Sequence, residues 1–99
     1  MRDKAEAHWK WIEYDLSSGA AITANLYVNG VLRQTLTIPL TAGVRVCTRL
    51  IFAPHWWGRL WRLTLSSPAE FEVYGLTAWL KQRGEAMSYR PQVLMALAG

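Results

Sequence analysis

Two carboxylates stand two residues apart near the start of the chain, where apolar and polar side chains alternate. Glu13 and Asp15 would share one face of a β-strand about 7 Å apart, because a strand rises about 3.3 Å per residue. Carboxylates at about that separation can hydrolyse a glycosidic bond. The same spacing is expected of any solvent-facing strand, and no matching acid stands in a pocket-forming loop. We therefore expect no hydrolase here.

Other catalytic chemistries have equally little support in the sequence. The candidate metal ligands His8, Cys47 and His55 lack the paired spacing of a metal site. The chain contains no Gly-x-Ser-x-Gly nucleophile motif and no glycine-rich phosphate loop. Cys47 is the single cysteine, which excludes an intrachain disulfide and favours a small, half-buried apolar role. We expect no enzyme, no bound metal and no cofactor.

Six tryptophans in 99 residues are the unusual feature of the composition. Trp61 shares an apolar strand face with leucines and is expected in the core, whereas Trp9 and Trp11 alternate with the residues expected to face inward. A domain this small cannot bury six indoles, so some are expected to meet a partner. The predicted interface comprises Trp9, Trp11, Trp56, Trp57 and Trp79, with Val93, Leu94, Met95 and Leu97 near the C-terminus.

Exposed aromatic rings at strand spacing suit three kinds of partner. They can stack on sugar rings or on bases, or they can be covered by another protein, since interfaces are enriched in Trp, Tyr and Arg. Four arginines could line one basic face for nucleic acid, namely Arg45, Arg49, Arg59 and Arg62. The net charge of +4 is modest, and nucleic acid is not the expected partner.

Short stretches of period-two alternation, each ended by turn residues, must position these side chains. Such a pattern predicts strands with one buried and one solvent-facing side. The Asn29-Gly30 dipeptide between two of them is the strongest hairpin signal, because both residues accept the positive φ of a type I′ turn. The expected strands span residues 8–16, 22–28, 31–38, 44–52, 59–66 and 71–81, with a bulge or bend at Gly75.

The chain is long enough for one small domain. The pattern predicts an all-β antiparallel sandwich of six to seven strands, jelly-roll or immunoglobulin-like, over residues 1–84. Residues 85–99 are expected to form a C-terminal docking arm or short helix that binds its own domain or a neighbour. The chain has no run of 18 apolar residues, so we expect no membrane insertion. The charged start of the chain lacks the apolar core of a signal peptide.

Three segments carry a resemblance to a known group of proteins: "LYVNG", "GRLWRLTLSS" and "FEVYGL". Together with the order of the strands over residues 9–82, they resemble small β-sandwich domains of tailed-bacteriophage virions, particularly tail and neck components. The resemblance implies a non-enzymatic structural protein, made in the host cytoplasm and built into the virion. It also implies other virion proteins as partners and a homo-oligomer whose copies bury strand edges and aromatic patches.

A second function remains open at this point. The domain could be a carbohydrate-binding module for attachment to a host surface, with exposed tryptophans stacking on a surface glycan. In that case Glu13, Asp15 or Asn25 would hydrogen-bond the sugar hydroxyls. An assembly protein should form multimers or bind a large partner, whereas a sugar binder should stay a monomer.

Overall fold

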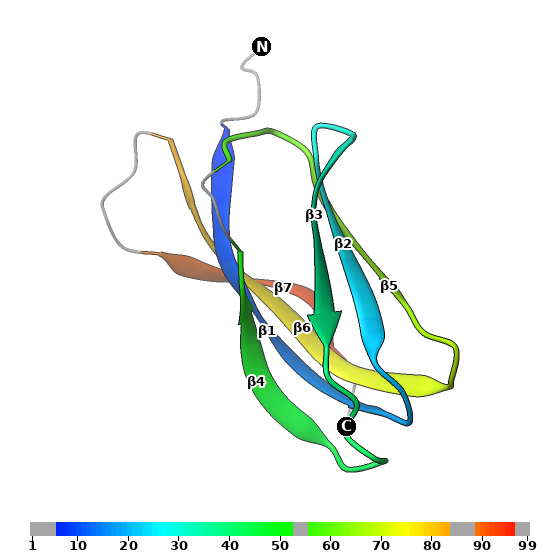
Figure 1. Ribbon diagram of the computed structural model, residues 1–99. Coiled ribbons are helices and arrows are strands. Elements are labelled where there is room, and N and C mark those ends of the chain that lie inside the picture. Colours follow the sequence, from blue (N-terminus) through cyan, green and yellow to red (C-terminus); the bar gives the residue numbers. More distant parts are fainter. Residues whose placement is uncertain (1–5, 53–55, 84–88, 97–99) are drawn as a thin grey trace.

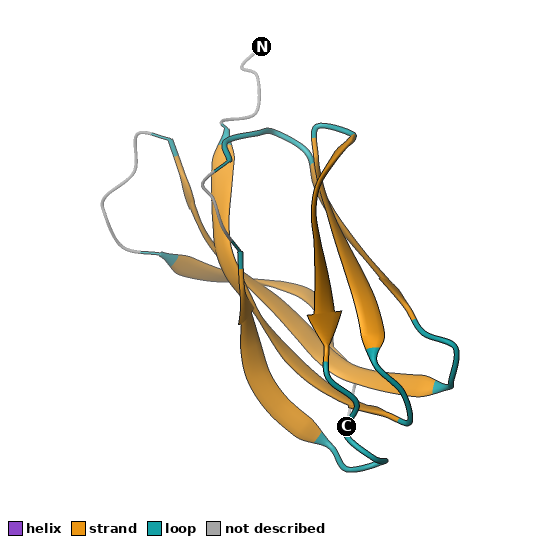
Figure 2. Cartoon of the chain, in the orientation of Figure 1, coloured by secondary structure: helices purple, strands orange, loops and turns teal. Residues whose placement is uncertain are grey.

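The chain folds as two antiparallel β-sheets that pack face to face (Figure 1). The structure is a computed structural model, and it describes residues 6–52, 56–83 and 89–96. Its strands are β1 (Ala7–Ser18), β2 (Ile22–Val28), β3 (Val31–Ile38), β4 (Val46–Ile51), β5 (Trp61–Ser66), β6 (Phe71–Gln82) and β7 (Arg90–Ala96). Figure 2 shows strands and loops over these ranges, which contain no helix. The predicted all-β antiparallel sandwich is confirmed.

One sheet has the order β4-β1-β6-β7 and the other the order β3-β2-β5. Consecutive strands share a sheet in only two places among these elements, at β2–β3 and at β6–β7. At every other step the chain crosses from one sheet to the other, which interleaves the two layers. Within the described residues, no helix has the length and apolar character needed to cross a membrane.

Alternating apolar side chains from both sheets fill the space between them. The fully buried members include Ile12, Leu16, Ile22, Leu26 and Ile38. Burying each of these side chains stabilises the fold by roughly 1.5–3 kcal/mol before the cost of ordering the chain. The two sheets are therefore held together by the pattern that predicts them.

The predicted hairpin turn is confirmed in its backbone geometry. Asn29 has φ 52° and Gly30 has φ 80°, which matches the two left-handed residues of a type I′ turn. The Asn29 side chain also accepts hydrogen bonds from the backbone N–H groups of Arg59 and Leu60, at 3.0 and 3.1 Å. This turn therefore anchors the start of β5 as well as joining β2 to β3.

A β-bulge at Lys10 corrects the predicted faces of β1. Trp9 pairs with Leu80 and Trp11 pairs with Trp79, so Lys10 is an extra residue without a partner on β6. The extra residue reverses the alternation that precedes it. Trp9 is consequently buried in the core with 6% of its surface exposed, and the prediction that it lies on the exposed face is wrong.

The C-terminal segment belongs to the sandwich. β7 pairs antiparallel with β6 and forms one edge of the four-stranded sheet. The segment thus packs on its own domain, as a strand rather than as a helix. A further register shift occurs near Gly75, between the pairs Asp15–Gly75 and Leu16–Val73, where the sequence predicts a bulge or bend.

Candidate functional site: an aromatic and cationic sheet face

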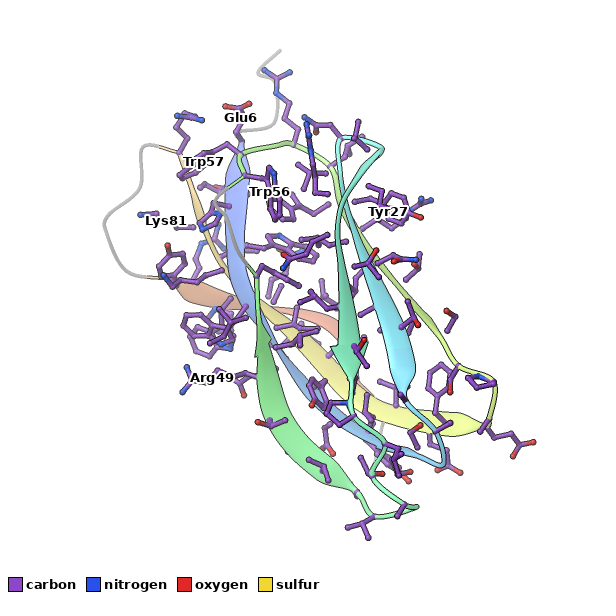
Figure 3. The ribbon with its side chains drawn as sticks, viewed as in Figure 1. Glu6, Tyr27, Arg49, Trp56, Trp57 and Lys81 are labelled. Atoms are coloured by element: carbon purple, nitrogen blue, oxygen red, sulfur yellow. The ribbon has the colours of Figure 1, made fainter. Side chains whose placement is uncertain are left out.

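The outer side of the four-stranded sheet carries a cluster of aromatic rings surrounded by cations. We call this surface the aromatic face. On β6, and on β1 apart from the bulge at Lys10, its residues alternate with buried core positions, so they point away from the other sheet. In Figure 3, Trp57, Lys81 and Arg49 lie on this outer side. Its rings are Trp11, Trp57, Trp79, Tyr89 and the imidazole of His8, and its cations are Lys10, Arg49, Lys81 and Arg83.

A stacked pair of indoles forms the middle of the aromatic face. Trp11 and Trp79 are opposite each other on neighbouring strands, with ring centroids 5.6 Å apart and planes inclined by 18°. On the β4 side, the guanidinium of Arg49 lies 5.4 Å from the Trp11 centroid. Stacking and cation–π contacts of this kind stabilise by roughly 0.5–1.5 kcal/mol each. Trp11 is therefore flanked by Trp79 and by Arg49.

Two lysine ammonium groups approach the ring of Tyr89. Lys10 on β1 and Lys81 on β6 lie 5.6 and 5.2 Å from its centroid. The phenol ring also contacts Trp11 at 5.9 Å. Among the described residues, no carboxylate forms an ion pair with either lysine. The ring attracts both cations, but it does not neutralise their charge.

His8 lies beneath the rings at the end of the aromatic face. Its side chain is 2% exposed, and its ring lies 5.5 Å from Trp57 and 6.0 Å from Tyr89. The ring nitrogen Nδ1 donates to the backbone oxygen of Trp56 at 3.0 Å, because a carbonyl can only accept. His8 therefore connects the start of β1 to the segment after β4 that carries Trp56 and Trp57, which we call the aromatic loop.

The side chain of Arg83 lies over the ring of Trp57. Its guanidinium lies 4.6 Å from the Trp57 centroid and donates to Glu6 at 2.8 Å. The two edge strands add exposed aliphatic side chains to the aromatic face, with Ile51 on β4 58% exposed and Val93 on β7 64% exposed. Ile51 pairs with Trp11 and so shares its face. Rings, cations and exposed aliphatic side chains thus form one continuous outer surface.

The structure brings together some of the residues predicted for an interface and separates others. Trp11, Trp57, Trp79 and Val93 all lie on the outer side of the four-stranded sheet. By contrast, Trp56 and Leu94 pack against the hydrophobic core, as does the buried Trp9, and Figure 3 shows Trp56 between the two sheets. Trp9 is buried, so its prediction as an exposed interface residue is wrong, whereas Trp56 and Leu94 are half-buried and their part in an interface stays a prediction.

The remaining predictions concern Met95 and Leu97 near the C-terminus and the four arginines. Met95 pairs with Leu76 in the backbone of β7, its side chain lies outside the described part, and Leu97 lies outside the described residues. The four arginines that could have lined one basic face are divided between surfaces. Arg45 and Arg49 project from the four-stranded sheet, while Arg62 lies over Tyr27 of the other sheet at 4.3 Å. The possible basic face is therefore not formed by these arginines.

Sequence reasoning missed the contributions of His8, Lys10, Arg83 and Tyr89. The alternation on β6 indicates that Lys81 shares a face with Trp79, but Tyr89 stands in a stretch that reads as a polar linker. Cys47 is exposed on β4, although a half-buried role is predicted. Only the antiparallel return of β7 beside β6 brings the region of Tyr89 back to β1.

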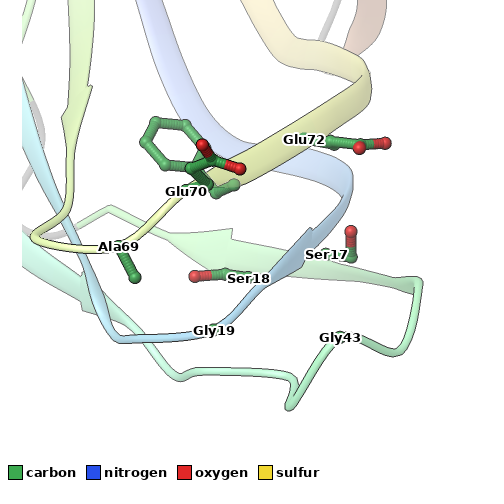
Figure 4. A pocket seen from close by; sticks show the side chains of 8 residues that line it. Ser17, Ser18, Gly19, Gly43, Ala69, Glu70 and Glu72 are labelled. Atoms are coloured by element: carbon green, nitrogen blue, oxygen red, sulfur yellow. The ribbon is translucent and has the colours of Figure 1, made fainter.

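A hollow lies at the end of the sandwich away from the aromatic face (Figure 4). It encloses about 470 Å³ and is lined by Ser17, Ser18, Gly19, Gly43, Ala69, Glu70, Phe71 and Glu72. Two of its polar side chains have local partners. The Ser18 hydroxyl donates to the backbone oxygen of Ala20, and Glu72 accepts a hydrogen bond from Tyr74 at 2.7 Å. These lining residues include no histidine, cysteine or lysine.

No group of three or more potential metal ligands occurs within the described ranges. Comparison of the chain with protein-family models, curated proteins and solved structures finds no match. The aromatic face carries three of the six tryptophans, Trp11, Trp57 and Trp79.

Proposed function

We propose that this chain is a non-enzymatic assembly protein whose aromatic face is covered by a neighbouring protein. The observation that carries the proposal is the position of the stacked Trp11–Trp79 pair. It lies on the outer side of a sheet, beside the exposed side chains of Ile51 and Val93. Tryptophan, tyrosine and arginine gathered around exposed aliphatic side chains are typical of the centres of protein interfaces.

The setting we propose is a bacteriophage virion, as a tail, neck or capsid-surface component. The support is the resemblance of residues 9–82 to small virion sandwich domains. The topology is compatible with it, because each sheet ends in two edge strands, β4 and β7 in one and β3 and β5 in the other. Such edges can pair with further chains, so copies of this protein could join through edges while the aromatic face meets another virion protein.

Sugar binding has less support from the geometry of the rings. A sugar stacks on a flat aromatic face that is open to solvent. Here Trp11 is flanked by Trp79 and Arg49, and Tyr89 is approached by two lysines. A sugar ring would have to displace these contacts before it could stack.

The test compares association of the native protein with that of surface variants. Val93→Glu and Ile51→Glu place a charge on the aromatic face at exposed positions, and Val31→Glu on β3, where Val31 is 48% exposed, is the matched control. We expect wild type and the control to be isolated in a complex with the neighbouring protein, at a native mass above the 11.3 kDa of one chain. The two face variants should associate roughly tenfold more weakly or worse.

Two outcomes would overturn the proposal. One is a wild-type protein that is an 11.3 kDa monomer in every preparation, including its native particle, and whose tryptophan fluorescence shifts with an oligosaccharide. The other is association of both face variants at wild-type strength. In either case the aromatic face would not be the surface that holds this protein in an assembly.

A further inference from the structure

We infer that the partner surface covering the aromatic face is an acidic protein surface, whose carboxylates lie against Lys10 and Lys81. This inference rests on the proposed function and specifies the chemistry of the partner. It starts from the two ammonium groups that approach Tyr89 at 5.6 and 5.2 Å. Two like charges held near one ring repel each other, and an anion between them would remove that cost.

The remaining charges of the aromatic face favour the same kind of partner. Its cations are Lys10, Arg49, Lys81 and Arg83, while the carboxylates beside them are Glu6 and Glu13. Glu6 already accepts a hydrogen bond from Arg83, and Glu13 is opposite Arg49 in the strand register. An excess of positive charge therefore remains around the two lysines.

A second copy is a poor occupant for this face. Two copies meeting through it would bring the lysines and arginines of one against those of the other, and like charges across an interface oppose association. Copies of the chain are better joined through other surfaces, such as the strand edges. The partner at the aromatic face is thus a different protein, with apolar side chains to meet Ile51 and Val93, which are exposed.

Nucleic acid fits the rings less well than a protein does. Single-stranded nucleic acid binds to aromatic surfaces by stacking its bases on open rings. Trp79 and Arg49 flank the Trp11 ring from the two neighbouring strands. Cations also cover the rings of Tyr89 and Trp57. A phosphate backbone could still approach the lysines, so the experiment must separate carboxylate from phosphate.

The experiment titrates the full chain with poly-L-glutamate and, separately, with oligodeoxythymidylate of equal charge, following tryptophan fluorescence. The test variant is Lys10→Gln/Lys81→Gln. The matched control is Arg33→Gln/Arg62→Gln. It also removes two positive charges from the chain's net +4, but it removes them from the other sheet. We expect poly-L-glutamate to bind wild type and the control alike, and the test variant roughly tenfold more weakly, as the loss of two exposed ion pairs implies.

Three outcomes would overturn the inference. Poly-L-glutamate could fail to bind, the control could weaken as much as the test variant, or the oligonucleotide could bind more tightly than poly-L-glutamate. The proposed function has a separate criterion, because it depends on the native mass of Val93→Glu and Ile51→Glu. If those variants lose association while Lys10→Gln/Lys81→Gln keeps it at full strength, the protein is an assembly protein whose partner is not acidic.

Discussion

Ala7 and Gly58 exchange two backbone hydrogen bonds. The N–H of Ala7 donates to the oxygen of Gly58 at 2.8 Å, and the N–H of Gly58 donates to the oxygen of Ala7 at 3.0 Å. The indole N–H of Trp61 donates to both carbonyl oxygens, at 3.1 Å each. This bridge fastens the aromatic loop to the start of β1, and it thereby places Trp57 over His8.

Replacing Gly58 with alanine should destabilise the protein. A Cβ at this position would collide with the buried side chain of Val28 and lie 3.1 Å from the side chain of Asn29. Neither neighbour can move freely, because Val28 is in the core and Asn29 accepts two backbone hydrogen bonds. We expect a loss of about 1–3 kcal/mol in the free energy of unfolding, measured by urea denaturation.

Gly19→Ala is the control for that substitution. The nearest heavy atom to a Cβ at Gly19 is the Cβ of Ala69, at the ordinary distance of 3.8 Å. Its free energy of unfolding should stay within about 0.5 kcal/mol of wild type. Equal losses in the two variants would show that close packing at Gly58 is not what requires glycine there.

Deleting Lys10 should be tolerated far better than deleting Glu13. Lys10 is the extra residue of the β1 bulge, so its removal leaves a regular strand in which Trp9 still points inward and Trp11 outward. The deletion removes the hydrogen bond from Phe52 N–H to the Lys10 oxygen, at a cost of about 0.5–1.5 kcal/mol.

Glu13 lies in the regular part of the strand. Its deletion would move every side chain before or after it in β1 to the opposite face of the sheet. Either the core residue Ile12 or its partners farther along β1 would then face solvent. Several such side chains at roughly 1.5–3 kcal/mol each would remove most of the stability of a small domain. Circular dichroism and urea unfolding should show a folded Lys10 deletion and an unfolded Glu13 deletion, and the reverse order would refute the bulge.

Acid should weaken the link between β1 and the start of β4. Arg45 donates two hydrogen bonds to the Asp15 carboxylate, at 2.7 and 2.8 Å, and these bonds hold the pKa of Asp15 below its usual value of 3.8. A carboxyl whose pKa is lowered by folding adds stability above the unfolded pKa, and this stability disappears as the pH falls through the folded pKa.

The measurement compares wild type with Asp15→Asn between pH 7 and pH 2. Wild type should be the more stable protein at neutral pH, and its advantage should shrink once the pH falls below about 5 and vanish at the acid end. Both side chains are partly exposed, so salt should reduce the difference at pH 7. A difference that persists unchanged to pH 2 would mean that this ion pair does not link pH to stability.

Local pattern predicted most of the fold. A strand with one buried side needs apolar residues at every second position, and such runs end at turn residues in this chain. The Asn29-Gly30 turn was predictable for the same reason, since its geometry depends on two adjacent residues. Exceptions occur where a single residue breaks the period. No residue near Lys10 marks it as a bulge, because a strand in which Trp9 and Trp11 share one face alternates just as regularly.

The aromatic face was predictable only in part. Alternation correctly places Trp11 and Trp79 on an outer surface, yet a period of two cannot say which strands are neighbours. Tyr89, Arg83 and Trp57 meet the other rings because β7 returns beside β6 and because Gly58 pairs with Ala7.

The alternation and the turn residues of the chain specify an antiparallel β-domain, its turns and most of its buried positions, because these depend on neighbours along the chain. Tertiary structure decided which tryptophans are core and which are surface, and it assembled two lysines around the ring of Tyr89. The reason is that strand pairing joins residues far apart in sequence. One bulge or one edge pairing changes which side chains meet without changing the local pattern that predicts the strands.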